Sequence, residues 1–183
     1  VVGLVGGVEN PEDRERLLAL CTEADVVIQN FRSGQVEKWG LDYETVRQPN
    51  PPIVYCSISG YGQDSPHRDW PAIDNIVQAT SGMMMLSGEE GDPPVRVGFP
   101  IVDTLTGQTA AIAILGALTQ RERGGGGSYI DVSMFDASIA FMTSAVTPYL
   151  VTGKPMSRMG NTGYSGLPTA SLFTARDGRQ ISL

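Results

Sequence analysis

The sequence feature that most restricts the fold is an apolar run over residues 108–120, which follows the segment 100–107. Its residues are small or apolar almost all the way round a helical wheel. This pattern is typical of a helix that is buried on most faces. We therefore predict a long central helix against which the rest of the chain packs.

Asp103 lies at the head of this predicted helix. An ionised carboxylate that enters an apolar core is costly unless other groups satisfy it. One interpretation is a first-turn acid that the helix dipole stabilises by about 0.3–1 kcal/mol. The other is a partly desolvated carboxylate held at a helix start as a nucleophile. The stretch alone favours the first interpretation and leaves the second open.

Of the 183 residues, 41% are apolar and 18% are charged, which is typical of a folded chain. The length suffices for one domain, or for one domain and part of another. The net charge of −7 argues against nucleic acid or an anionic membrane as a partner, but it is compatible with a local basic pocket for a phosphorylated ligand. No apolar run reaches the roughly 18–20 residues that span a bilayer. We expect neither a nucleic-acid nor a membrane partner.

The two cysteines, Cys21 and Cys56, lack the spacing of a metal site. They predict a reduced, intracellular protein, which is cytoplasmic or, in a eukaryote, mitochondrial or peroxisomal. The first residues carry no basic segment of a secretory signal, and the last ones fall inside a predicted strand. We expect a segment of a longer protein.

Predicted strands and helices alternate along the first 151 residues. Asn10 as the N-cap, Pro11 at the first helical position and acidic residues in the first turn predict a helix that ends near Ala24. A strand before it and a strand after it make a βαβ unit with a parallel sheet and a right-handed crossover. The predicted strands are residues 1–5, 25–30, 53–58 and 129–133, and the other predicted helices are residues 35–39, 43–47, 72–86 and 134–151.

The pattern changes after residue 151. Residues 152–168 are rich in glycine and polar side chains, and residues 170–174 and 180–183 flank a turn at 175–178, which is the pattern of a β-hairpin. We predict a large α/β domain over residues 1–153. Residues 154–183 are predicted to be a linker and the truncated start of a smaller α+β domain.

Few motifs of known chemistry occur in the sequence. It has no phosphate-binding loop, dinucleotide fingerprint, nucleophile elbow or metal-binding histidine spacing, and we predict no metal site. His67, the only histidine, is interpreted as a solvated loop residue, and Cys56 as a small core residue. The glycines at 124–127 follow a helix and are interpreted as a helix-to-strand turn. Asp103 is the best catalytic candidate by elimination.

Seven segments are weak signals singly, but their order and spacing together are specific. They are residues 24–34, 39–41, 50–62, 74–82, 98–107, 118–127 and 129–136. Together they resemble the family III CoA-transferases, the CaiB/BaiF group that includes formyl-CoA transferase and carnitine CoA-transferase. The resemblance implies a Rossmann-like large domain with a parallel sheet and a smaller α+β domain, in a homodimer of interlocked rings.

The resemblance also implies that Asp103 is the nucleophile of a CoA-transferase. Its carboxylate attacks an acyl-CoA thioester, which gives a mixed anhydride and a CoA thiolate. The thiolate then forms an aspartyl-CoA thioester and releases the donor acid, and an acceptor acid reverses these steps. An acyl-CoA and a carboxylic acid are thus the expected substrates, with no permanently bound cofactor.

Two further groups of residues are implied by the resemblance. The CoA groove is formed by Asn30, Phe31, Arg32, Lys38 and Trp39, although relatives more often have Arg and Met or Leu at the last two positions. A loop over the active site corresponds to residues 160–168. There Gly163, Tyr164, Ser165 and Gly166 replace the run of four glycines and a glutamine that is common in relatives.

Two alternatives to CoA transfer accompany the resemblance. The α-methylacyl-CoA racemases share the fold and use the same aspartate with a histidine that aligns with Ile73. Isoleucine cannot carry a proton, so the sequence favours transfer over racemisation. The second alternative is a non-catalytic CoA-binding module.

Overall fold

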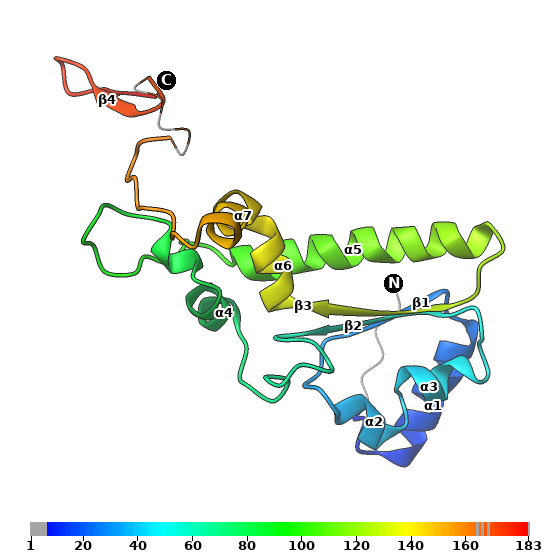
Figure 1. Ribbon diagram of the computed structural model, residues 1–183. Helices are drawn as coiled ribbons and strands as arrows, with labels where there is room; N and C mark the ends of the chain where they lie inside the picture. The colour runs from blue at the N-terminus through cyan, green and yellow to red at the C-terminus, as the bar shows by residue number, and fades with distance from the viewer. Residues whose placement is uncertain (1–6, 164, 166, 168, 183) are drawn as a thin grey trace.

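The computed structural model describes residues 7–163, 165, 167 and 169–182 (Figure 1). In chain order the elements are α1 (Pro11–Glu23), β1 (Val26–Gln29), α2 (Gln35–Trp39), α3 (Tyr43–Arg47), β2 (Val54–Ser59), α4 (Asp74–Thr80), the 3₁₀ helix η1 (Met83–Met85), α5 (Ile101–Glu122), β3 (Ser128–Ser133), α6 (Met134–Phe141), α7 (Thr143–Thr152), β4 (Leu172–Thr174) and β5 (Gln180–Ser182). The strand predicted for residues 1–5 lies outside the described residues.

Three parallel strands form the central sheet. β2 lies between β1 and β3, and Val54 is in register with Val26 on one side and with Ser128 on the other. Helix α5 runs along one face of this sheet, and α1, α2 and α3 lie on the opposite side (Figure 1). The prediction of a parallel α/β sheet is therefore confirmed, as is the N-terminal cap of α1, where Asn10 accepts a hydrogen bond from the N–H of Glu12 at 3.1 Å.

Alternating side chains of β2 supply the core on both faces of the sheet. Cys56, fully buried, packs with Ala110 and Ile114 of α5, as predicted for a small core residue. Tyr55 packs with Val46 of α3 on the opposite face. The alternation follows from the two-residue period of a strand, and the burial on both faces from helices that cover a parallel sheet.

Helix α5 is long, as predicted, but the prediction that most of its faces are buried is wrong. Its buried residues form one stripe, whereas Ile112 and Leu115 are 72% and 64% exposed. A helix that lies on a sheet buries only the side that faces the strands, so an apolar composition all round does not fix how many faces are covered.

By length and composition alone α5 could cross a bilayer, contrary to the expectation that no segment is long and apolar enough. Among the described helices, α6 and α7 would also pass as a pair, although they are bent by 81°. The buried stripe of α5 packs on β2 and β3, which is the arrangement of a core helix in an α/β layer.

Two predicted helices are each interrupted by a sharp bend. The helix predicted for residues 72–86 ends at α4 and resumes as η1, because Gly82 adopts a left-handed backbone (φ 79°) that ends the first helix. The helix predicted for residues 134–151 divides into α6 and α7 at Met142, which is 7% exposed. Both bends turn methionine side chains into one cluster, so tertiary packing overrides the apolar periodicity.

Residues beyond α7 lead away from the sheet to a separate hairpin (Figure 1). Strands β4 and β5 pair antiparallel, and Ala175 and Arg179 close the turn with a backbone hydrogen bond of 2.8 Å. The predicted hairpin is confirmed. The division into domains at residues 153 and 154 stays a prediction.

The glycine run after α5 makes the predicted helix-to-strand turn. Gly127 lies close to residues 51–53, the segment that leads into β2. A Cβ at Gly127 would be 2.4 Å from the carbonyl oxygens of both Pro51 and Ile53. At Gly126 a Cβ would meet no atom within 4 Å. Two neighbouring glycines therefore differ in whether the fold can accept a side chain.

We predict that Gly127→Ala destabilises the complete protein by about 1–3 kcal/mol, because the added methyl group forces two backbone segments apart. Gly126→Ala, its control, should change stability by less than about 1 kcal/mol. Urea unfolding followed by circular dichroism measures both. Equal midpoints for the two variants would contradict the close approach at Gly127.

Candidate active site

A side chain from a different helix holds the start of α5. The Asp74 carboxylate, at the first position of α4, accepts hydrogen bonds from the backbone N–H groups of Val102 (2.7 Å) and Asp103 (3.2 Å) through the same oxygen, Oδ2. Pro100, the N-cap residue, makes no side-chain cap. The first N–H groups of a helix lack intrahelical partners and carry positive partial charge, so a carboxylate satisfies and stabilises them.

Gln78 fixes this capping carboxylate from one turn further along α4. Its Nε2 donates to Asp74 Oδ1 at 2.6 Å, and its Oε1 accepts from the N–H of Val97 at 2.8 Å. The Gln78 side chain is completely buried, where an unpaired amide would be costly. One polar network thus joins α4, the loop that precedes α5, and the start of α5.

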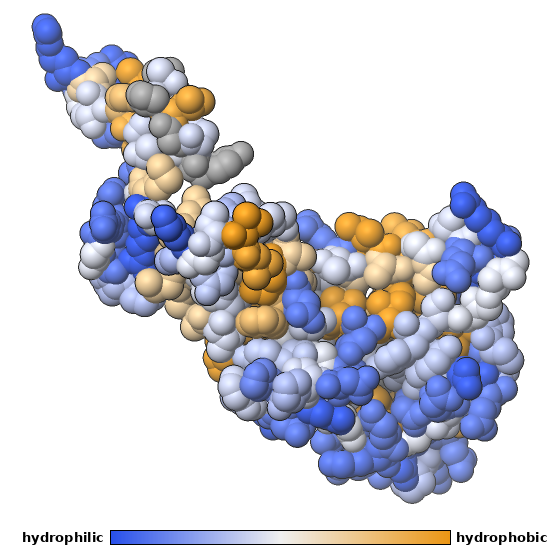
Figure 2. Space-filling model, viewed as in Figure 1, coloured by the Kyte–Doolittle hydropathy of each residue, from blue (hydrophilic) through white to orange (hydrophobic). Residues whose placement is uncertain are grey.

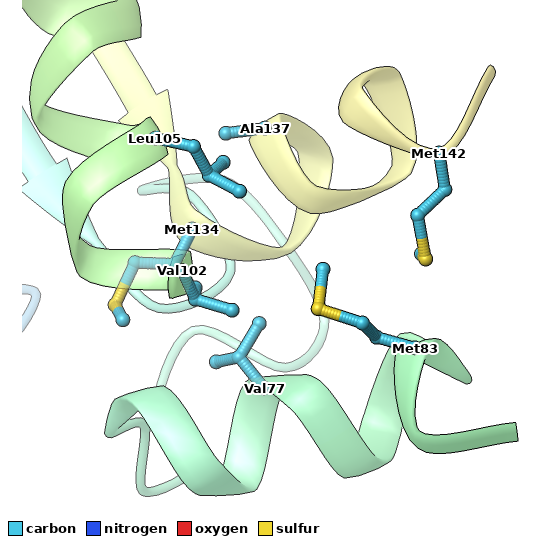
Figure 3. Packing of buried hydrophobic residues seen from close by; sticks show 7 residues of the cluster. All are labelled: Val77, Met83, Val102, Leu105, Met134, Ala137 and Met142. Carbon is cyan, nitrogen blue, oxygen red and sulfur yellow. The ribbon is translucent and has the colours of Figure 1, made fainter. Parts of the chain in front are cut away.

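An apolar cluster packs α4 and the start of α5 together (Figure 3). Its members come from α4, η1, α5, α6 and the α6–α7 junction, and they are Val77, Met83, Val102, Leu105, Met134, Ala137 and Met142. Val102 is fully buried in it. Successive residues of a helix point about 100° apart, so burial of Val102 turns the neighbouring Asp103 side chain outward.

The Asp103 carboxylate is exposed, and no hydrogen-bond donor among the described residues contacts it. Partial desolvation, and then the negative charge of Asp74, raise the pKa of Asp103 above its usual value. Asp74, not Asp103, performs the capping that the first sequence interpretation assigned to this acid. The oxygens of Asp103 are free for a reactant, on a backbone that Asp74 holds in place.

A cavity of about 160 Å³ opens at the carboxyl ends of β1 and β2. Three residues that the resemblance assigns to the CoA groove, Asn30, Phe31 and Arg32, lie in its wall. Ile73, which precedes the capping Asp74, and Met134, which packs with Val102, complete the opposite side. The cavity therefore extends from the predicted CoA groove toward the start of α5.

The other two predicted CoA-groove residues lie on α2, outside the wall of this cavity. Phe31 and Trp39 meet edge to face, with 5.0 Å between ring centroids. Trp39 lines a second hollow against Pro11 and Leu18 of α1, and Lys38 is exposed. The structure thus brings Trp39 to the cavity only through its contact with Phe31.

The predicted covering loop is described only in part, because Tyr164 and Gly166 lie outside the described residues. Gly160 donates a backbone hydrogen bond to Gly88 at 3.0 Å, and Gly163 donates one to Ala170 at 2.5 Å. The chain then continues away from α5 toward the β4–β5 hairpin (Figure 1). A cover of Gly163 and Ser165 over Asp103 stays a prediction.

Comparison with known proteins places this chain in a family. The family model of the CoA-transferase family III matches residues 7–183. The chain belongs to the family III CoA-transferases. The mixed α/β fold agrees with this assignment: a CaiB/BaiF family protein from Brucella suis superposes with a TM-score of 0.86 at 36% identity, over 94% of this chain and 46% of that protein.

Two similar family III CoA-transferases have names that state their substrates. The chain is 38% identical to a succinate–glutarate CoA-transferase of Agrobacterium fabrum, over 93% of this chain and 44% of that protein. It is 42% identical to an acetyl-CoA:oxalate CoA-transferase of Acetobacter aceti, over 86% of this chain and 41% of that protein. The chain spans less than half the length of these relatives.

Asp74 and Gln78 were not predicted from the sequence as residues of the candidate active site. A signal for them exists: the two polar residues stand four positions apart, and hence on one helical face, inside an otherwise apolar segment. Periodicity could show that they face the same way. It could not show that this face meets the start of α5, because Asp74 and Val102 are 28 positions apart in the chain.

We predict that Asp74→Asn lowers the pKa of Asp103, because the substitution removes a negative charge that disfavours the second carboxylate. Labelling of Asp103 by a carbodiimide, which requires the protonated acid, should then fall off at a lower pH than in the wild type. Peptide mass spectrometry across a pH series measures the midpoint. Asn caps helices about as well as Asp, so the fold should persist.

Glu44→Gln is the matched control, since it removes an exposed carboxylate on α3 that pairs with Arg47. Its labelling midpoint at Asp103 should equal that of the wild type. If Asp74→Asn and Glu44→Gln gave the same midpoint, charge coupling between Asp74 and Asp103 would be refuted.

Proposed function

We propose that the complete protein transfers CoA from an acyl-CoA thioester to a carboxylic acid, with Asp103 as the nucleophile. The observation that carries the proposal is the geometry of Asp103: an exposed carboxylate without a described donor, on a helix start fixed by Asp74. Membership of the family III CoA-transferases supports the reaction class.

The proposed reaction runs through three covalent intermediates on Asp103, which are an anhydride with the donor acid, a thioester with CoA and an anhydride with the acceptor acid. One carboxylate oxygen attacks the thioester carbon, and the C–S bond breaks to give a mixed anhydride and CoA thiolate. The thiolate then attacks the aspartyl carbonyl, releases the donor acid and leaves an aspartyl-CoA thioester. The acceptor acid attacks this thioester, and the released thiolate returns to the acceptor's acyl carbon. Each step keeps an activated acyl group, so no ATP is consumed.

The capping arrangement restricts how the intermediates are stabilised. Asp74 already occupies the N–H groups of Val102 and Asp103, so these two amides are not free to receive an oxyanion. The donors for the tetrahedral intermediates are therefore other groups of the complete protein. In return, the fixed helix start limits how far the Asp103 carboxylate can move between attack and release.

We further propose short carboxylic acids, dicarboxylic acids among them, as the substrate class. The names of two relatives, with 38% and 42% identity, specify succinate and glutarate or acetyl-CoA and oxalate. Racemisation is disfavoured by the position of Ile73. Its side chain lines the cavity beside Asp74 and offers no ionisable group for a second proton transfer.

The assembly and location of the complete protein are also proposals. Ile112 of α5 and Leu150 and Val151 of α7 are exposed apolar side chains. Hydrophobic patches are visible over both helices (Figure 2), and such patches support the interlocked homodimer implied by the resemblance. Cys21 and Cys56 are both free thiols, which supports a reducing compartment such as the cytoplasm.

The decisive experiment is label exchange between acyl-CoA and free carboxylic acids with the complete protein and its Asp103→Asn variant. We expect Asp103→Asn to lower turnover by at least about 10³-fold, because the amide is a poor nucleophile. Incubation of the wild type with acyl-CoA should give an adduct on the Asp103 peptide that hydroxylamine removes.

Three outcomes would overturn parts of this proposal. Retention of turnover by Asp103→Asn would refute the role of Asp103. Tight CoA binding without label exchange would favour a non-catalytic CoA-binding module. Exchange of an α-proton with deuterated solvent, with no acyl exchange, would favour the racemase reaction.

A further inference from the structure

Arg68 is a second arginine in the wall of the cavity at the carboxyl ends of β1 and β2. It comes from the loop after β2, whereas Arg32 comes from the loop after β1. The two guanidinium groups thus reach one cavity from segments that are 36 positions apart in the sequence. The family resemblance assigns Arg32 to the CoA groove and assigns no role to Arg68.

The Arg68 side chain passes close to a glycine turn. Gly34 has a left-handed backbone (φ 80°), and a Cβ placed there would lie 3.3 Å from Arg68 Nη2. The guanidinium group therefore lies beside the turn that joins the loop after β1 to α2. Arg32 and Ser33 directly precede Gly34 in this turn, and both line the same cavity as Arg68.

Ser33 supplies a polar atom to the same wall. Its Oγ is buried and has no hydrogen-bond partner among the described residues. A buried hydroxyl without a partner costs free energy, since its lost bonds to water are not replaced. An oxygen of a bound anion would accept a hydrogen bond from this hydroxyl and satisfy it.

The charges around the cavity favour an anion. The lining residues include two arginines and no aspartate or glutamate, in a chain of net charge −7. The described acid nearest to Arg68 is Asp69, whose Oδ1 is 4.0 Å from Arg68 Nε and whose side chain is 86% exposed. An ion pair with so exposed a partner is weak, so the positive charge of Arg68 is available to a ligand.

We propose that Arg68, with Arg32 and Ser33, binds a phosphate group of CoA. This inference rests on the proposed function and names a residue that sets the affinity for its CoA substrate. Guanidinium groups suit phosphate because their planar array of donors matches its oxygens. A phosphate carries more negative charge and more oxygens than a single carboxylate. Two arginines and one hydroxyl therefore match a phosphate better.

The location of the cavity agrees with this assignment. Asn30 and Phe31 of the predicted CoA groove line the same cavity as Arg32. Ile73 and Met134 line it too, and they connect it to the α5 start because Ile73 precedes Asp74 and Met134 packs with Val102. A CoA molecule held here by its phosphates can extend its pantetheine arm past Ile73 toward Asp103.

The test measures binding of CoA, dephospho-CoA and pantetheine to the complete protein by isothermal titration calorimetry. We expect Arg68→Gln to weaken CoA binding about tenfold or more, with a smaller loss at high salt. Binding of pantetheine, which has no phosphate, should be unchanged. Arg68→Lys, which keeps the charge, should recover part of the affinity. If Arg68→Gln loses affinity for CoA but not for dephospho-CoA, Arg68 binds the 3′-phosphate. If it loses the same affinity for both ligands, Arg68 binds the pyrophosphate. Either result supports the proposal.

Arg123→Gln is the matched control, because it removes the same charge at the far end of α5 and should leave the affinity for CoA unchanged. Unchanged CoA binding in Arg68→Gln would overturn the inference. The inference would also be overturned if Arg68→Gln changed only the KM for a dicarboxylic acid, because Arg68 would then bind a substrate carboxylate. Absence of CoA binding in the wild type would instead refute the proposed function, so the two failures are distinguishable.

Discussion

The hydrogen bonds from the start of α5 to the Asp74 carboxylate are the interaction on which the rest of the site depends. Proline at the N-cap leaves α5 without a cap of its own, and the carboxylate of a different helix replaces it. Because a charged acceptor at a helix start is favourable, this contact fixes α4 against α5 at the residue that carries the candidate nucleophile. Gln78 then fixes Asp74 and ties the loop before α5 to the same point.

The same contact has an electrostatic consequence for Asp103. Partial desolvation disfavours the ionised form of Asp103, and the negative charge of Asp74 acts on Asp103 in the same direction. Asp74 is bonded through both oxygens, whereas Asp103 has no described donor. The pair thus divides into a structural carboxylate and an available one, although the two residues have identical side chains.

Met134 connects the two halves of the site. It packs in the apolar cluster with Val102 and also lines the cavity that contains Arg32 and Arg68. Parallel strands bring these regions together, since β1, β2 and β3 all end at one edge of the sheet. A binding cavity and a candidate nucleophile far apart in sequence therefore occupy neighbouring positions.

Much of the local structure followed from the sequence, and the exceptions share a cause. The cap at Asn10, the parallel strands, the glycine turn after α5 and the β4–β5 hairpin depend on neighbours in the chain, and their patterns predicted them. The breaks at Gly82 and Met142 were missed because apolar residues stand on both sides of each bend. The direction of each bend is set by the apolar cluster that Met83 and Met142 enter. That cluster exists only in the packed molecule.

The sequence by itself determined that Asp103 stands at the first turn of a long apolar helix and that Asn30, Phe31 and Arg32 follow a strand. Only the tertiary structure decided that Asp74 caps that helix, that one face of α5 stays exposed, and that Arg68 lies beside the Gly34 turn. The physical reason is the range of the interactions. Helix starts and strand ends are governed by residues a few positions away, whereas caps from other helices and shared cavities depend on how distant segments pack.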